Sequence, residues 1–145
     1  MNVLFWNIRG LGQAGRRAQL VDLVKDYKVD IFCLQETIKA TFSRKQLVLL
    51  GGNFVYHWEI KPADGHSGGM LIAAREDVFD LISAEPGEFF SSVVVRHKAS
   101  NVQWEVINIY GPAGYERKVE FLQELASKLG RVVDHVLVGG DFNLI

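Results

Sequence analysis

Short apolar runs, separated by glycine, proline and polar residues, recur along the whole chain. Runs of about four to eight apolar or alternating residues bounded by turn formers are typical of β-strands. Two longer segments, 13–27 and 115–129, repeat apolar residues at helical spacing, and Thr41 or Ser43 can cap a third, short helix that ends before Gly51-Gly52. The strands are expected at 3–6, 31–35, 54–60, 69–74, 81–84, 92–97, 103–110 and 136–138.

Each of the two longer helices has an apolar face that is expected to pack against a sheet. Residues spaced at i, i+3, i+4 and i+7 lie on one side of a helix. The expected buried residues are Leu20, Leu23, Val24 and Tyr27 in the first helix and Val119, Leu122, Ala126 and Leu129 in the second.

The order of these elements predicts an α/β fold in a single domain that spans residues 1–145. Strands outnumber helices, and several follow one another between residues 69 and 110, which favours two packed sheets with helices outside over a simple alternating βαβ fold. A hydrophobic content of 48% in 145 residues supports a packed core and argues against disorder. The net charge of −1 excludes a protein that binds nucleic acid through overall charge alone.

The cysteine content and the lengths of the apolar runs indicate the cellular compartment of the protein. Cys33 is the single cysteine and lies in an apolar strand, which favours a buried thiol in a reducing compartment. No apolar run approaches the ~18 residues of a membrane helix. We therefore expect an intracellular protein that has no membrane partner.

Polar residues interrupt the apolar strands at their carboxyl ends. Asparagine and aspartate often end strands because they favour turns, and a tyrosine there often only packs. Turn preference explains one such strand end more easily than four strands that all end in amides, carboxylates or a phenol. Enzymes built on β-sheets commonly carry their catalytic groups at strand ends. Asn108 and Tyr110 share one face of their strand, so both are expected to project into a cleft. The residues concerned are Asn7, Gln35, Glu36, Asn108, Tyr110, Asp141 and Asn143.

Five motifs follow one another along the chain: Trp6-Asn7-Ile8-Arg9-Gly10, Leu34-Gln35-Glu36-Thr37, Gly68-Gly69-Met70-Leu71-Ile72-Ala73, Asn108-Ile109-Tyr110-Gly111-Pro112 and Gly140-Asp141-Phe142-Asn143. In their order and rough spacing they resemble the endonuclease/exonuclease/phosphatase superfamily. The resemblance covers essentially the whole chain and is closest to the apurinic-endonuclease-like domain of plant LINE-type non-LTR retrotransposons. It implies a four-layered α/β sandwich, in which two packed β-sheets are flanked by helices.

The resemblance also implies a role for each candidate site residue. Glu36 matches the principal metal ligand and Asn7 the asparagine beside the metal, which is expected to be Mg²⁺, with Mn²⁺ as the alternative. Asp141 matches the aspartate that orients or deprotonates the attacking water. Asn7, Tyr110 and Asn143 match residues that bind the substrate phosphate, and Tyr110 and Asn143 act with Asp141 in catalysis. The implied reaction is in-line attack of water on a phosphodiester.

One motif of the superfamily has no match in this sequence. The superfamily carries a Ser-Asp-His motif in its second half, whereas this sequence reaches Ile145 two residues after Asn143, and none of its four histidines follows Ser-Asp. His66 is the histidine expected nearest the cleft. We therefore expect a sandwich that is incomplete at the C-terminus, self-association through an open sheet edge, and impaired or absent activity.

Three functions remain open at this stage. The first is a Mg²⁺-dependent endonuclease that nicks DNA, with a nuclear location by analogy to retroelements only. The second is a non-catalytic retroelement remnant or interaction module. The third is an inositol-phosphate-type phosphatase of the same superfamily.

Overall fold

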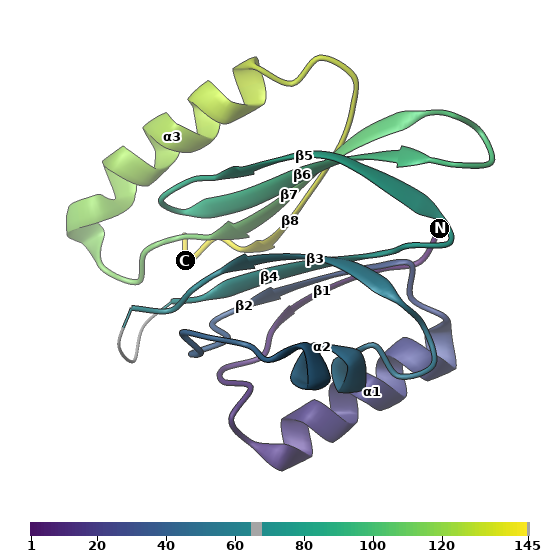
Figure 1. Cartoon of the computed structure of the whole chain (residues 1–145). Coiled ribbons are helices and arrows are strands. Elements are labelled where there is room, and N and C mark those ends of the chain that lie inside the picture. The colour runs from purple at the N-terminus through teal and green to yellow at the C-terminus, as the bar shows by residue number, and fades with distance from the viewer. Residues whose placement is uncertain (65–67, 145) are drawn as a thin grey trace.

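Two four-stranded β-sheets stack face to face, and helices cover both outer surfaces (Figure 1). This arrangement comes from a computed structural model, which describes residues 1–64 and 68–144. The first sheet has the order β1-β2-β4-β3 and the second the order β5-β6-β7-β8. The strands are β1 (Val3–Asn7), β2 (Ile31–Gln35), β3 (Tyr56–Lys61), β4 (Met70–Arg75), β5 (Phe79–Pro86), β6 (Phe90–His97), β7 (Gln103–Tyr110) and β8 (His135–Asp141).

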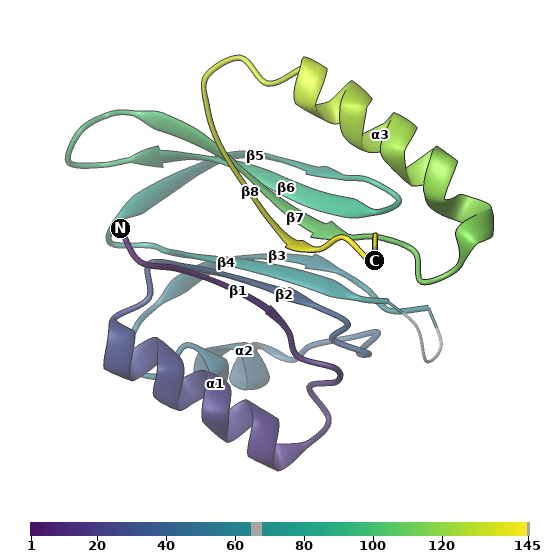
Figure 2. The ribbon, with the colours of Figure 1, turned by 180° about the vertical axis from the view of Figure 1, so that it is seen from behind.

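The helices form the two outer layers of the sandwich. α1 (Ala14–Tyr27) and α2 (Arg44–Leu50) cover the first sheet, and α3 (Lys118–Gly130) covers the second, preceded by a 3-10 turn at Tyr115–Arg117 (Figures 1 and 2). The predicted α/β sandwich is confirmed, and every predicted strand and helix is present with shifted bounds in most cases. Residues 65–67, including His66, lie outside the described residues. No helix in the described part of the chain is long and apolar enough to cross a membrane.

β2 is buried on both faces, which explains its uninterrupted apolar sequence. Phe32 and Leu34 point into the core beneath α1 and α2. Ile31 and Cys33 point the other way, into the core between the two sheets. Because side chains alternate along a strand, this single strand contributes to both cores. Burial also raises the pKa of the Cys33 thiol, which keeps it protonated.

The short helix α2 begins at one of the two predicted caps. The Ser43 hydroxyl accepts a hydrogen bond from the backbone N–H of Gln46 at 3.2 Å, and the Gln46 side chain accepts one from the Ser43 backbone N–H at 2.9 Å. This reciprocal pair satisfies two N–H groups that the helix cannot satisfy itself. Of the two candidates, Ser43 is therefore the cap.

Two predictions about helix faces were wrong. In α1, Leu20 and Val24 are buried as expected, but Tyr27 is 65% exposed because the chain turns away at Lys28, which has a left-handed backbone. In α3, the stripe that is buried runs through Phe121 and Lys128. The residues predicted to be buried are exposed instead: Val119, Leu122, Ala126 and Leu129.

The buried face of α3 is held by one aromatic contact and one group of charges. The Phe121 ring packs edge-on against Phe89, with 5.5 Å between ring centroids. The Lys128 ammonium bonds Glu85 at 2.8 Å and Glu105 at 2.5 Å. A lysine is usually read as a solvent-facing residue, and this ion pairing is what places it on the inner face.

A pair of buried amide side chains joins the two sheets. Gln35 Nε2 at the end of β2 donates to Asn108 Oδ1 on β7 at 2.7 Å. Asn108 Nδ2 donates in turn to the carbonyls of Leu34 at 2.9 Å and Leu71 at 3.3 Å. Asn108 was expected to project into a cleft. That prediction was wrong, because its side chain is fully buried between the sheets and bonds the opposite sheet.

The edge strands β1 and β8 lie on the same side of the sandwich (Figure 2). Each pairs with one neighbour only among the described residues, β1 with β2 and β8 with β7. The Phe5 ring of β1 lies so close to Gly139 of β8 that a Cβ there would approach it to 2.7 Å. β1 and β8 are thus edge strands of the described residues, and self-association through an open sheet edge stays a prediction.

The buried amide pair predicts a large cost for Asn108→Leu. Loss of the Asn108 side chain would remove three buried hydrogen bonds and leave Gln35 Nε2 with its longer bond to the Cys33 carbonyl at 3.3 Å, at a cost of about 2 to 4 kcal/mol of unfolding free energy. Denaturant unfolding measures this. Gln103→Leu also replaces an amide side chain by leucine, at an exposed position of the same strand, and should cost less than about 0.5 kcal/mol. Equal effects of the two variants would contradict the role given to the amide pair.

The charges under α3 predict a pH dependence of stability. Hydrogen bonds from Arg131 and Lys128 lower the pKa of Glu85 from 4.5 to about 2. A carboxyl whose pKa is lowered by folding stabilises the fold above its unfolded pKa and loses that contribution as the pH falls through its folded pKa. The gap in unfolding free energy between the wild type and Glu85→Gln should be widest at neutral pH, shrink below about pH 4.5 and close near pH 2. A gap that does not change with pH would refute this account.

Candidate active site

The carboxyl ends of four strands meet at one end of the sandwich. β1 runs parallel to β2, so Asn7 lies beside Gln35, and β7 runs parallel to β8, so Tyr110 lies beside Asp141. The Gln35–Asn108 contact brings these two parallel pairs together from opposite sheets. Most of the predicted site residues therefore lie around one point, although they come from distant parts of the sequence.

A direct hydrogen bond crosses between the sheets at this point. Asn7 Nδ2 donates to Asp141 Oδ2 at 2.8 Å, and the two residues are 134 positions apart in the sequence. Asp141 Oδ1 accepts a second hydrogen bond from the backbone N–H of Asn143 at 3.1 Å. Each carboxylate oxygen thus has one donor, and the two hydrogen bonds fix the orientation of Asp141.

Tyr110 lies next to two carboxylates. Burial, and then the negative charges of Glu36 and Asp141, raise the pKa of its phenol. A hydrogen bond between Tyr110 and Glu36 adds to this shift, and the raised pKa keeps the phenol protonated at neutral pH. The half-buried phenol can exchange its bond to Glu36 for one to an anionic group bound in front of it.

The backbone around these residues is unusually strained. Four non-glycine residues here adopt left-handed conformations: Arg9 (φ 52°), Glu36 (φ 57°), Ile38 (φ 51°) and Asn143 (φ 51°). Each such residue costs on the order of 1 kcal/mol or more, and such conformations gather at functional sites. Two backbone bonds hold the strained loop, from Gly10 N–H to the Glu36 carbonyl at 2.7 Å and from Ile38 N–H to the Gly68 carbonyl at 3.2 Å.

Asn143 lies beside Asp141 but makes its own contacts. Its side-chain Nδ2 donates to the carbonyl of Gly111 at 2.7 Å, and its carbonyl accepts a bond from the Lys118 ammonium. The side-chain nitrogen is therefore already bonded to the main chain. The predicted contact of Asn143 with a substrate phosphate stays a prediction.

The oxygen donors at this end of the sandwich fit a small, hard divalent cation. Glu36 and Asp141 supply carboxylates, and Asn7 supplies an amide oxygen. Within residues 1–64 and 68–144, no three side chains among His, Cys, Asp and Glu come together as a ready-made metal cage. Mg²⁺ suits such a sparse set, since it commonly takes one or two protein carboxylates and keeps several waters.

A groove of about 540 Å³ lies beside Tyr110, and the sequence pattern gave no indication of it. The Lys61 ammonium crosses to the loop before β6 and donates to the Gly87 carbonyl at 2.6 Å. Arg117 lies over the Phe89 ring, 4.6 Å from its centroid, and pairs with Glu88 at 3.1 Å. Its place in the groove depends on the packing of α3, which the local sequence does not reveal.

Comparisons with solved structures show the same fold in proteins of low sequence identity. A humanised TDP2 of D. rerio superposes with a TM-score of 0.78 at 19% identity, over 99% of this chain and 66% of the other. The human nocturnin catalytic domain with bound sulfate gives 0.68 at 21% identity, over 97% and 64%. A mannosyl-6-phosphatase of Bacteroides thetaiotaomicron gives 0.67 at 19% identity, over 97% and 64%.

The chain spans about two thirds or less of the length of each of these structures. At such identities the likeness establishes the fold alone. No curated protein sequence matches the chain. The model of the Endonuclease/Exonuclease/phosphatase family, in contrast, matches residues 4–145, which include all the candidate residues at the strand ends. By this match and by its fold, the chain belongs to the endonuclease/exonuclease/phosphatase family.

Proposed function

We propose that this domain hydrolyses phosphodiester bonds of DNA as a Mg²⁺-dependent endonuclease of the LINE retrotransposon type. The observation that carries the proposal is the Asn7–Asp141 hydrogen bond, which joins the two sheets beside Glu36 and Tyr110. Enzymes of the family generally use divalent metals. The Trp6-Asn7-Ile8-Arg9-Gly10 opening supports the retrotransposon type, and with it a nuclear role.

Each proposed step follows from contacts of this chain. Glu36 and Asn7 would hold the cation, which supplies positive charge to the phosphate oxygens when it is bound. Asp141, oriented by Asn7 and the Asn143 backbone, accepts a hydrogen bond from the attacking water and takes up its proton. As the water oxygen bonds to phosphorus, the bond to the leaving oxygen breaks on the opposite side.

Tyr110 supplies a hydrogen bond to the substrate phosphate. Its protonated phenol donates to a non-bridging phosphate oxygen, where negative charge develops during the attack. The groove beside it, which contains Lys61 and Arg117, would receive the flanking part of the substrate. No histidine takes part in these steps, so we expect turnover to be slow.

A second candidate function is a phosphatase that acts on a small phosphate ester such as an inositol phosphate. It is favoured by the structural neighbours named as a mannosyl-6-phosphatase and as ANGEL2, a 2′,3′-cyclic phosphatase. The same Glu36, Tyr110 and Asp141 would serve both reactions. The two functions differ in whether the groove beside Tyr110 holds a polynucleotide or a single small ester.

The proposal predicts slow, metal-dependent nicking of supercoiled plasmid DNA. Relaxed plasmid should accumulate with Mg²⁺ and not with EDTA, and Glu36→Gln should slow this by about 100-fold or more, the order of magnitude of losing a group that stabilises charge in the transition state. Gel electrophoresis over long incubations measures the rate. The matched control is Glu76→Gln, an exposed carboxylate at the far end of the first sheet, which should leave the rate unchanged.

Other outcomes decide between the candidates. Mg²⁺-dependent phosphate release from an inositol polyphosphate, without plasmid nicking, would favour the phosphatase. Absence of metal-dependent cleavage of either substrate would favour a non-catalytic interaction module. Nicking that persists in EDTA or in Glu36→Gln would refute the proposed site.

A further inference from the structure

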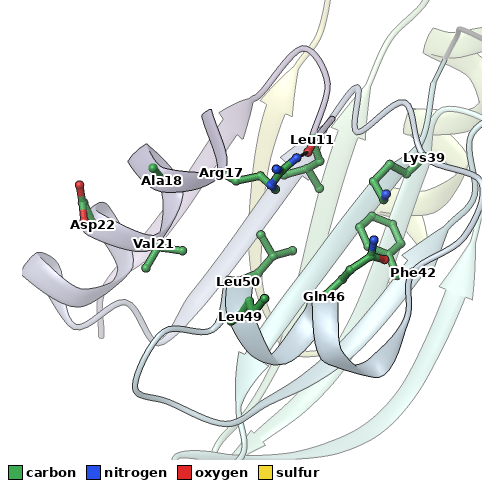
Figure 3. A pocket seen from close by; sticks show the side chains of 10 residues that line it. All are labelled: Leu11, Arg17, Ala18, Val21, Asp22, Lys39, Phe42, Gln46, Leu49 and Leu50. Atoms are coloured by element: carbon green, nitrogen blue, oxygen red, sulfur yellow. Dashed lines mark hydrogen bonds between the residues drawn. The ribbon is translucent and has the colours of Figure 1, made fainter. Parts of the chain in front are cut away.

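A second concave site lies on the opposite face of the first sheet from the strand interface, between α1 and α2. It has a volume of about 540 Å³, within the range of pockets that hold small molecules. Figure 3 shows α1 on one side of it and α2 on the other, with Leu11 at one end. None of its lining residues belongs to the candidate active site.

The walls of this groove are mainly apolar. Leu11 and Leu50, both nearly fully buried, form part of its base. Ala18 and Val21 line it from α1, and Leu49, which is 64% exposed, lines it from α2. A ligand with an apolar body would remove this surface from water, at roughly 25 cal/mol per Å².

The charged residues of the groove are separated by sign. Arg17 and Lys39 lie at the end near Leu11, whereas Asp22 lies at the other end (Figure 3). Arg17 donates one hydrogen bond to the Leu11 carbonyl at 2.8 Å, and the Lys39 ammonium lies 5.4 Å from the centre of the Phe42 ring. No carboxylate of the described residues lies within ion-pair distance of either cation. Two cations without counter-charges at one end of an apolar groove are complementary to an anionic head group.

We propose that this groove binds a small amphipathic anion, that is, a molecule with an aromatic or aliphatic body and one sulfonate, carboxylate or phosphate group. The body lies along Leu11, Val21 and Leu50, and the anionic group lies between Arg17 and Lys39. The site is separate from the proposed active site, so it can be tested whatever the outcome of the nicking experiments.

A matched pair of dyes tests the requirement for an anion. 8-Anilinonaphthalene-1-sulfonate and N-phenyl-1-naphthylamine share the same aromatic body, and only the first carries a sulfonate. Fluorescence titration should show tighter binding of the sulfonate. Arg17→Gln and Lys39→Gln should each weaken its binding about fivefold, as expected for one partly exposed ion pair, and leave binding of the neutral dye unchanged. Arg44→Gln removes an exposed cation of α2 outside the groove and is the control.

A second pair of variants tests the location. Ala18→Trp fills the groove from α1 and should abolish binding of both dyes, while Ala14→Trp places the same side chain on an exposed position of α1 outside it and should have no effect. Arg17→Lys should restore most of the affinity lost in Arg17→Gln. Equal affinity for the two dyes, or sulfonate binding unchanged in Ala18→Trp, would overturn the proposal. Equal affinity would mean that the groove binds only the apolar body of the dye. Unchanged binding in Ala18→Trp would mean that the dye binds at another place on the protein.

Discussion

The hydrogen bond between the buried side chains of Gln35 and Asn108 determines how the two sheets of this protein meet. Neither amide can be buried alone without a cost of a few kcal/mol, so the bond between them specifies one alignment of β2 against β7. Glu36 follows Gln35 directly, and Tyr110 is two residues beyond Asn108 on the same face of β7. The alignment that satisfies the amides therefore also places the carboxylate beside the phenol.

The outer strands extend the same alignment. Parallel pairing brings Asn7 beside Gln35 and Asp141 beside Tyr110, and the bond between Asn7 and Asp141 then joins the two sheets at the surface end of the interface. The left-handed backbones in this region are sustained by hydrogen bonds between loops. A site built in this way needs both sheets, which explains why strands from the two ends of the sequence contribute to it.

How far the sequence predicted the structure depended on what each residue contacts. The bounds of β2 and β7 were correct because apolar runs that are buried on both faces end sharply at polar residues. The inner face of α3 was missed because Lys128 is buried by ion pairs with residues of two distant strands. The direction of Asn108 was missed for a similar reason, since its partners lie on the other sheet. The candidate residues at the strand ends were proposed from local pattern and family resemblance, whereas the grooves depend on packing between elements.

The central claim is that Glu36, together with Asn7, holds a divalent cation at the end of the sheet interface. Titration of the chain with Mn²⁺, followed by electron paramagnetic resonance of the free ion, tests this without relying on turnover. The account predicts one bound ion per chain, displaced by excess Mg²⁺, retained in Glu76→Gln and lost in Glu36→Gln. Mn²⁺ binding that is absent from the wild type, or equally strong in Glu36→Gln, would contradict it.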